Sequence, residues 1–443
     1  MDDKRTTLGL LDDRTPGGIA SAIARQITDG EFRPGDRLPT VRDVATELGV
    51  SPATVSAAWQ LLGRAGLVVS RGRSGSFVRS APRDWLPRSY HDFDQQTDVR
   101  LDLSRGTPDP ELLPSLVPAL NSMAARADTS SYQLKPDIPE LHDLMRDTWP
   151  SPVESLTVLN GALDAIDRIL ASVARFGDRV AVESPGFPPF FELLEQYGLE
   201  PVPLALDARG VVPSSLASAL GSKPVAVLLQ PRAQNPTGVS MDAARAEELA
   251  RVIARHPNGD DVVIIQDDHS SAISTADDVT LARWLPDQVL HIRSFSKTHG
   301  PDLRIAALGG PRKLVDRIVS RRLLGPGWTS RMLQTALHTL LTNPSSIAEV
   351  DHARSVYAER RIGIHTALAA RGLAVVIADG INAWLPVADE RAAIVRLGAA
   401  GILVASGSAF QLGTAADHIR VTVGIVRENL DQLAEALVDA ARA

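Results

Sequence analysis

Apolar residues near the start of the chain recur at the three- to four-residue spacing of an amphipathic helix. Ile19, Ile23 and Ile27 each lie about one turn after the last, and Gly30 follows as a stop. The pattern therefore predicts a helix over residues 19–29. A connector rich in proline and glycine comes next, with the sequence Phe-Arg-Pro-Gly-Asp-Arg-Leu-Pro, and it is predicted to be a turn.

Two further short helices follow this connector. Thr40 is a suitable N-cap for a helix over residues 41–48, which a glycine ends. Ser51 caps a third helix that has proline at its first position and runs to about residue 65. Two short helices joined by a Gly-Val-Ser turn predict a helix-turn-helix, whose second helix leaves its N-terminal residues free for base edges.

The apolar pattern changes to that of a two-stranded hairpin over residues 67–78. Its tip contains Arg71, Arg73 and Gly75, so it is basic and can approach phosphates or a minor groove closely. Helix-turn-helix and hairpin together predict a winged DNA-binding head. The alternative is a helical oligomerisation module that carries a solvated basic hairpin.

From about residue 101 onward, short runs of valine, isoleucine and leucine alternate with helical stretches. Four such runs cover residues 179–183, 226–230, 262–266 and 288–293. Strands of this kind separated by helices predict a parallel, doubly wound sheet and an α/β fold class. Ligands of such sheets bind at the carboxyl ends of the strands. Informative residues do follow predicted strands: Gly161, Ala162, Phe187, Asn235, Asp267 and Lys297.

The last third of the body alternates differently. A helix is predicted over residues 347–370 and a final one over 427–441, with strand-like runs at 374–378, 381–385, 402–405 and 418–423 between them. From about residue 345 to the end, this succession of helices and strands resembles the small α+β domain of an aminotransferase.

One lysine lies in a turn of small, hydroxyl-bearing residues that could bind a reactive ligand. Ser294 lies three residues before Lys297, Ser296 lies directly before it, and Arg304 follows seven residues later. A lysine amine can condense with an aldehyde as a Schiff base, while hydroxyls and a guanidinium can hold a phosphate. The pattern therefore suits a phosphorylated aldehyde. By itself such a lysine can equally be an ordinary surface residue.

Composition and charge narrow the class of protein. A chain of 443 residues predicts two or three domains, and the absence of cysteine excludes disulfides and thiolate metal sites. The net charge of −7 divides into +2 for residues 1–80 and −9 for the remainder, which favours a head that faces nucleic acid. Neither a signal-peptide core nor an apolar run of membrane-spanning length is evident, and no metal-ligand cluster is found, so a cytoplasmic protein without a metal is expected.

The head resembles the winged helix-turn-helix of GntR-family transcription factors over about residues 17–79. Two phrases carry the resemblance, Leu-Pro-Thr-Val-Arg-Asp-Val-Ala at 38–45 and Gly-Val-Ser-Pro-Ala-Thr-Val at 49–55. The resemblance implies that Arg42 contacts the DNA backbone, Thr54 the groove, and Arg73 with Gly75 the wing site. The family usually has arginine where this chain has Pro52. The implied DNA-binding residues are Arg42, Ser51, Thr54, Arg71, Arg73 and Gly75.

The body resembles the fold-type I aminotransferases, which use pyridoxal 5′-phosphate, and joined to this head it resembles the MocR subgroup of regulators. The resemblance implies a Schiff base between Lys297 and the cofactor, and an ion pair between Asp267 and the pyridine nitrogen. It implies that Asn235 donates to the phenolic oxygen and that Phe187 stacks on the ring. The implied phosphate ligands are Gly161, Ala162, Ser294, Ser296 and Arg304.

Three more residues take their roles from the same resemblance. Tyr132 would reach the phosphate of a partner subunit, which implies a homodimer with shared sites. Arg420 would bind the carboxylate of an amino-acid-like effector. His269 stands where the subgroup usually has a tyrosine that bonds the phenolic oxygen, a bond that imidazole can also donate, although its charge varies near neutral pH.

These observations predict a DNA-binding head over residues 1–79, a linker over 80–100 and an aminotransferase-like body over 101–443. The favoured function is a transcriptional regulator, not an enzyme, that senses pyridoxal phosphate or an amino-acid-like effector and controls vitamin B6 or amino-acid metabolism. Slow half-transamination stays open. The alternative is a pyridoxal-phosphate-dependent aminotransferase with an accessory DNA-binding head.

Overall fold

The computed structural model divides the chain into two compact units, which are described separately. The first is formed by Met1–Gln95 with Ala174–Val180 and Pro189–Pro201, and the second by the remainder. The predicted linker from residue 80 to 98 and the hairpin tip at 71–74 lie outside the described residues. The structure describes residues 13–28, 31–33, 35–64, 67–70, 75–78, 99–126, 132, 135–413 and 416–443.

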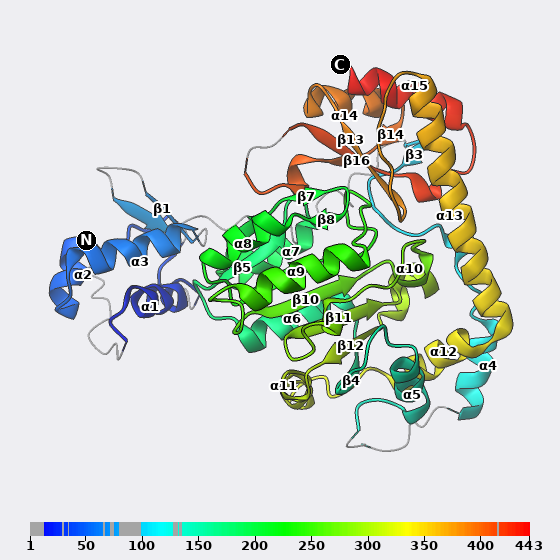
Figure 1. The fold of residues 1–443 in the computed structure, drawn as a ribbon. Helices are drawn as coiled ribbons and strands as arrows, with labels where there is room; N and C mark the ends of the chain where they lie inside the picture. The colour runs from blue at the N-terminus through cyan, green and yellow to red at the C-terminus, as the bar shows by residue number, and fades with distance from the viewer. Residues whose placement is uncertain are drawn as a thin grey trace. The chain divides into compact units, whose positions relative to one another are not determined.

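The N-terminal head contains three helices and a hairpin, in the order that the sequence predicts (Figure 1). Strands β1 and β2 are antiparallel, with Val68 opposite Val78. An apolar core that includes Ile23, Val44 and Leu62 holds the helices and the hairpin together. The elements are α1 Pro16–Thr28, α2 Val41–Leu48, α3 Pro52–Arg64, β1 Val68–Ser70 and β2 Ser76–Val78.

Side-chain caps set the ends of the two central helices. The Thr40 hydroxyl accepts a hydrogen bond from the Asp43 amide at the start of α2. Gly49 ends α2 in the left-handed region, at φ 67°, where a side chain would be strained. The Ser51 hydroxyl accepts from the Thr54 amide at 3.1 Å and so caps α3. The Gly-Val-Ser turn between the helices is therefore defined by its own sequence.

The connector between α1 and α2 is not only a turn. The Leu38 amide donates to the Ser76 carbonyl, and the Val78 amide donates to the Asp36 carbonyl, both at 2.9 Å. Arg37 forms a bridge opposite Phe77. The connector thus pairs with the hairpin through one isolated β-bridge, which the proline and glycine content did not predict.

The larger unit is built on a seven-stranded sheet with the order β4-β12-β11-β10-β9-β5-β6. Strands β9, β10 and β11 are parallel, which confirms the expected α/β class. The sheet is mixed rather than wholly parallel, because β12 runs antiparallel to both β11 and β4. The strands are β4 Ser155–Leu159, β5 Arg179–Glu183, β6 Glu200–Leu204, β9 Ala226–Leu229, β10 Val263–Asp268, β11 Val289–Ser294 and β12 Ala306–Gly310.

Apolar residues of α8 and α9 pack against the central strands in one cluster, which contains Leu216, Leu249, Val227 and Ile264. This packing holds the carboxyl ends of β9, β10 and β11 in register. The other elements of this part are β3 Leu101–Asp102, β7 Leu206–Asp207, β8 Gly210–Val211, α4 Val117–Arg126, α5 Pro139–Asp147, α6 Ala162–Val173, α8 Pro213–Gly221, α9 Ala243–Arg255, α10 Ser296–His299, α11 Arg312–Leu323 and α12 Arg331–Thr342. Helix α7, Pro188–Gln196, belongs to the first unit from its second residue onward. Short 3-10 turns lie at Pro110–Leu112, Ser271–Ile273, Leu281–Arg283, Pro301–Leu303, Ser408–Phe410 and Val423–Ile425.

The C-terminal part begins with one long helix and contains a three-stranded antiparallel sheet of order β13-β16-β15 (Figure 1). The run 374–378, predicted as a strand, is not one, although Val375 and Ile377 within it are buried. Within the described ranges, no helix combines the length and apolarity needed to cross a membrane. The elements are α13 Pro344–Ala370, β13 Asn382–Pro386, α14 Glu390–Ala399, β14 Ile402–Leu403, β15 Ala405–Ser406, β16 His418–Thr422 and α15 Leu430–Ala441.

A buried carboxylate fastens the start of the body to its C-terminal part. Asp109 is fully buried and receives hydrogen bonds from Arg360 at 2.7 Å and from Arg427 at 2.6 Å. Its backbone amide donates to the Tyr357 hydroxyl. Burial raises the pKa of Asp109, but the bonds from the two arginines outweigh burial and hold the pKa below its ordinary value.

Removal of this carboxylate should destabilise the body strongly. Asp109→Ala leaves the largely buried Arg360 without its acid, a change that costs about 3–5 kcal/mol for a buried ion pair, whereas the exposed Arg427 keeps its ion pair with Glu111. Urea unfolding followed by circular dichroism measures it. Asp351→Ala is the control, because Asp351 makes an exposed pair with Arg354 and should change the unfolding free energy by less than about 1 kcal/mol. Equal losses in the two variants would contradict the structural role of Asp109.

Candidate functional site

Lys297 lies at the carboxyl edge of the sheet, because α10 starts two residues after β11 ends. Its side chain is half-buried. Burial lowers the pKa of Lys297 to about 8; Asp267 acts in the opposite direction, and the positive charge of Arg420 lowers it further. A substantial fraction of the amine is therefore neutral near physiological pH, which is the form that attacks a carbonyl carbon.

Asp267 is the acidic partner of this lysine, near the end of β10. Burial raises its pKa to about 6, against the effects of a hydrogen bond from Gln230 and of the charge on Lys297. One carboxylate oxygen, Oδ2, accepts from Nε2 of Gln230 at 2.9 Å. The other, Oδ1, is buried and has no hydrogen-bond partner among the described residues. The site thus contains a buried acceptor without its donor.

Gln230 is a site residue that the sequence reading missed. Its side-chain oxygen accepts from the Asn235 amide at 2.9 Å while its nitrogen binds Asp267, so one amide positions both residues. Gln230 follows β9 directly. A polar residue that ends a fully apolar strand run was the available signal.

A second buried carboxyl group, that of Glu183, is hydrogen-bonded to Gln230. Glu183 accepts hydrogen bonds from the Gln230 amide at 3.1 Å and from the side chain of Gln234 at 3.2 Å. Burial raises the pKa of Glu183 to about 8, with a smaller contribution from Asp267, so this group is mostly protonated at neutral pH. The negative charge of the pair therefore resides on Asp267.

His269 is buried and neutral, because burial lowers its pKa to about 3. Its Nε2 lies 2.9 Å from the Ala233 carbonyl oxygen, which can only accept, so Nε2 carries the single ring proton. Nδ1 is then an acceptor, 3.4 Å from the Ser270 hydroxyl. The donor role expected for His269 would require a second ring proton or a rotated ring, because its one N–H is already used.

Asn235 and Phe187 reach the same region from separate loops. The Asn235 side-chain oxygen accepts from Nδ2 of Asn382 at 3.5 Å, which leaves the amide nitrogen as the free donor end. Asn382 in turn accepts from Thr422 at 3.2 Å. Phe187 is half-buried and directly precedes α7, and the Gly186 amide beside it donates to the Phe410 carbonyl.

A second cluster forms where α6 begins. Gly161 has φ 102°, and a Cβ atom there would lie 3.0 Å from Nη2 of Arg304. Arg304 itself has φ 49° and donates to the Asn160 carbonyl at 3.5 Å. An exposed guanidinium beside the free amides of a helix N-terminus, at Gly161 and Ala162, is suited to a phosphate. Ser294 is buried, and its hydroxyl accepts from the Ser296 amide at 3.4 Å.

Arg420 on β16 is buried, with 4% of its surface exposed. Its guanidinium lies 5.1 Å from the centre of the Phe410 ring and donates from Nη2 to the Ser104 carbonyl. Nε has no hydrogen-bond partner within the described part of the chain. Burial lowers the pKa of Arg420 to about 10, and Asp102 opposes this effect, so the group keeps its charge at neutral pH. A buried cation with an unused N–H favours an anionic ligand.

The fold brings three acidic or basic side chains together that the sequence did not place near one another. Asp268, Asp278 and His291 offer ligand atoms within 4.8 Å. Arg232 already binds both carboxylate oxygens of Asp268, at 2.9 and 2.7 Å, and approaches Asp278 at 3.4 Å. Arginine therefore balances these charges, and the group resembles a structural ion-pair cluster more than a cation site.

Other predicted residues lie apart from the lysine. The Tyr132 ring is 97% exposed and meets Trp328 edge-on at 6.1 Å, so one chain does not bring it to Lys297 by a described contact. In the head, Arg42 is exposed on α2, and the hydroxyls of Ser51 and Thr54 are 2.8 Å apart. Gly75 has φ 103°, while Arg71 and Arg73 lie outside the described residues.

These residues fit pyridoxal 5′-phosphate. The orphaned Oδ1 of Asp267 suits a protonated pyridine nitrogen, the donor end of Asn235 suits a phenolic oxygen, and the Gly161–Arg304 cluster suits a phosphate. Lys297 supplies an amine of lowered pKa. Three separate requirements of one molecule are thus met by polar groups that the chain itself leaves unsatisfied or exposed.

Two protein families match the chain. Residues 17–78 match the gntR family of bacterial regulatory proteins. Residues 99–437 match aminotransferase class I and II.

Curated relatives extend over most of the chain, and solved structures share the fold of its larger part. The vitamin B6 salvage pathway transcriptional repressor PtsJ of Salmonella typhimurium is 35% identical over 427 residues, or 95% of this chain and 96% of that protein. The pyridoxine biosynthesis transcriptional regulator PdxR of Corynebacterium glutamicum is 26% identical over 78% of this chain and 77% of its own length. The α-aminoadipate aminotransferase LysN of Thermus thermophilus, solved with N-(5′-phosphopyridoxyl)-L-leucine, has a TM-score of 0.67 and 20% identity. It covers 77% of this chain and 92% of its own, and shows the fold.

The lowered pKa of Lys297 gives a test that needs no bound ligand. Competitive acetylation of the protein across a pH series, quantified by mass spectrometry, should give a midpoint near 8 for Lys297, because only the neutral amine reacts. Asp267→Asn should move this midpoint lower, since it removes the charge that favours the protonated amine. The exposed Lys313 serves as the internal reference. A midpoint at the ordinary lysine value in both proteins would contradict the described site.

Proposed function

Since this chain belongs to the GntR family of bacterial regulatory proteins and carries a class I and II aminotransferase domain, we propose that it is a transcriptional regulator of the MocR type. The head binds operator DNA, and the body binds pyridoxal 5′-phosphate as a sensor. The observation that best supports this function is the Asp267 carboxylate oxygen that has no hydrogen-bond partner among the described residues, in a chain whose head has the three helices and the paired strands β1 and β2 of a winged helix-turn-helix.

When bound, pyridoxal 5′-phosphate supplies an aldehyde carbon and a ring that accepts electrons once its nitrogen is protonated. The chain contributes the amine of Lys297 and the charge of Asp267, which holds a proton at that nitrogen. Gln230 keeps the Asp267 carboxylate oriented. The remaining ligands are proposed to be Asn235 at the phenolic edge, joined by His269 once its ring turns its N–H away from the Ala233 carbonyl, and Phe187 on the ring face. The proposed phosphate ligands are Gly161, Ala162, Ser294, Ser296, Arg304 and a partner's Tyr132.

Two kinds of signal are consistent with this arrangement. PtsJ and PdxR are named for vitamin B6 salvage and pyridoxine biosynthesis, which supports pyridoxal phosphate itself as the signal and vitamin B6 supply as the regulated process. The unused N–H of Arg420 supports an additional effector with a carboxylate, such as an amino acid. In either case the ligand changes DNA affinity only by binding two states of the protein unequally.

Regulation is favoured over a dedicated enzyme. The regulatory relatives include one that spans nearly the whole chain, whereas similarity to the aminotransferase structures is at the level of fold. Lys297, Asp267 and Arg420 are nevertheless all in place, so one slow round of amino transfer is compatible with the site. Repeated turnover at ordinary enzyme rates, without any DNA site, would favour an aminotransferase with an accessory head.

A homodimer is part of the proposal. Leu116, Val117 and Leu120 are exposed at the start of the body, and Leu324 is 92% exposed. Exposed apolar side chains of this size support contact with a second copy. A second copy would also bring in the exposed Tyr132 side chain, whose ring meets Trp328 in its own chain, in line with the proposed shared sites. We expect this dimer to act in the cytoplasm, where operator DNA is found.

Cofactor binding and DNA binding should be separable by mutation. Lys297→Ala should abolish the covalent attachment of pyridoxal phosphate that borohydride traps, and should change the visible absorbance of the protein. Arg42→Ala should weaken operator binding about tenfold or more and leave that absorbance unchanged, because Arg42 is exposed on α2 in the head. Trapping that persists in Lys297→Ala would refute the assignment of the lysine.

The role of Arg420 can be tested independently. Arg420→Gln removes the buried positive charge, so candidate amino acids should no longer perturb the absorbance of the loaded protein, whereas binding of pyridoxal phosphate should change less than threefold. Spectroscopic titration with amino acids and with the corresponding amines that lack a carboxylate is the measurement. An unchanged response to both series would exclude a carboxylate subsite at Arg420.

A further inference from the structure

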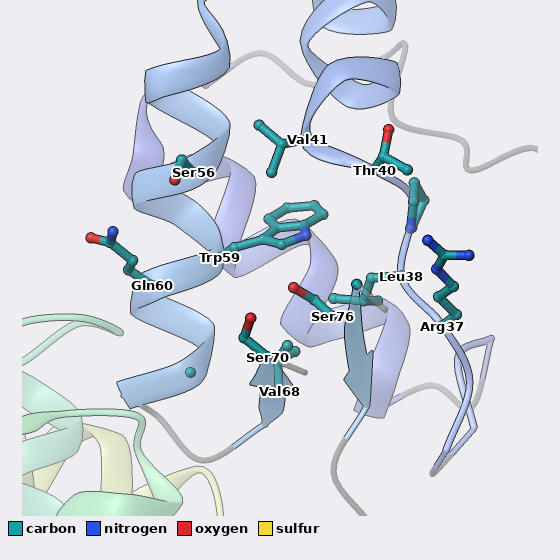
Figure 2. Close-up of a pocket in the computed structure, with 13 residues that line it drawn as sticks. Arg37, Leu38, Thr40, Val41, Ser56, Trp59, Gln60, Val68, Ser70 and Ser76 are labelled. Atoms are coloured by element: carbon teal, nitrogen blue, oxygen red, sulfur yellow. The ribbon is translucent and has the colours of Figure 1, made fainter. Parts of the chain in front are cut away.

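A groove crosses the head between α3, the hairpin and the connector (Figure 2). Its volume is about 430 Å³, within the range of ligand-binding clefts. Trp59 lies in the middle, and hydroxyl groups of Ser56, Ser70 and Ser76 surround it (Figure 2). Neither the predicted DNA contacts in α2 nor those at the N-terminus of α3 account for this groove.

Charge in the groove comes from one residue. Arg37 lines it and is exposed, and none of the 13 lining residues is acidic. Arg37 makes no hydrogen bond or ion pair with a described residue; the nearby carboxylate of Asp36 accepts instead from the Arg33 amide at 2.9 Å. The groove therefore offers an unneutralised guanidinium, several hydroxyls and the amide of Gln60 to a ligand, a set that favours a phosphate.

The backbone fixes Arg37 in this position. Arg37 is bridged to Phe77 of β2, so its Cα is held by the extended sheet. Gly75 lies against its guanidinium: a Cβ atom there would be 2.8 Å from Nε. Glycine at this position leaves room for the arginine to remain beside the hairpin, which is a reason for Gly75 other than contact with DNA.

The face of α3 that lines the groove continues to the N-terminal end of the helix, which is expected to contact DNA bases. Ser56, Gln60 and Gly63 line the groove at spacings of four and three residues, so they share one face of α3. Ala53 continues this face toward the N-terminus and is exposed. The opposite face, with Ala58 and Leu62 among its residues, is buried in the head.

DNA geometry identifies what can occupy such a groove. A recognition helix lies in the major groove, and a basic hairpin beside it approaches the adjacent minor groove. Major and minor grooves are separated by one sugar–phosphate strand, which must then run between helix and hairpin. We propose that this strand lies in the groove and that Arg37 binds one of its phosphates, with Ser56 and Gln60 as uncharged contacts. The inference rests on the proposed function of the head.

Salt dependence of DNA binding tests the proposal in the full-length protein. Loss of one phosphate contact lowers the slope of log K against log salt by about 0.9, and lowers affinity about eightfold near 100 mM salt. Arg37→Gln should show this change for each bound head, equally on operator and non-specific DNA. Arg37→Lys should restore most of the slope, because it retains the charge. Arg25→Gln is the control, since Arg25 is exposed on α1 and does not line the groove.

The outcomes separate this inference from the function on which it rests. If the wild-type protein shows no sequence-preferring DNA binding, both fall. If it binds but Arg37→Gln and Arg25→Gln have equal slopes and affinities, the contact at Arg37 is refuted while the regulator stands. If Arg37→Gln keeps the wild-type slope but abolishes competition by inorganic phosphate at constant ionic strength, the groove binds a free anion, which also refutes it. Circular dichroism of each variant verifies that the head is folded.

Discussion

The body depends on one electrostatic constraint: an ionised carboxylate and a half-buried amine share a region with little water. Burial alone would neutralise both Asp267 and Lys297, raising the pKa of the first and lowering that of the second. Each moderates the shift of the other, and the Gln230 amide adds a hydrogen bond to the carboxylate. Asp267 is consequently charged, as binding of a ring nitrogen requires, and Lys297 is partly neutral, as attack on a carbonyl requires.

Residues around Asp267 and Asn235 set the charge and the orientation of these two site residues. Glu183 is mostly protonated, so it does not add a second negative charge beside Asp267. Asn382 and Thr422, from the C-terminal part, orient Asn235 through a short chain of hydrogen bonds. Asp109 fastens the same part to the start of the body.

Much of this arrangement follows from local sequence, and the rest does not. The caps at Thr40 and Ser51 define the head, and buried strand runs predict the α/β body because these signals are local. Three features depend on distant pairing. The direction of β12 is set by its neighbours β4 and β11, and the connector pairs with a hairpin some forty residues later. In the run 374–378, Val375 and Ile377 are buried, but the run pairs with no described strand and so is not a strand itself.

The site shows the same division. Lys297 and Asp267 are evident as isolated residues after strands, but the proton on His269 is decided by the Ala233 carbonyl, 36 residues earlier. Gln230 acquires its importance only when β9 and β10 lie side by side. A residue type indicates which chemistry is available, whereas its hydrogen-bond partner decides which atom donates.

The pairing of the connector with the hairpin has a consequence for the DNA rather than for the protein. Backbone hydrogen bonds from Leu38 and Val78 join the segment before α2 to the hairpin, so the separation between hairpin and helix-turn-helix is set by main-chain geometry and hardly by side chains. The distance between the two DNA-contacting parts of such a head is therefore fixed. Operators of differing groove width must then adapt to it by bending or twisting, and the stiffness of their base steps becomes part of what is recognised.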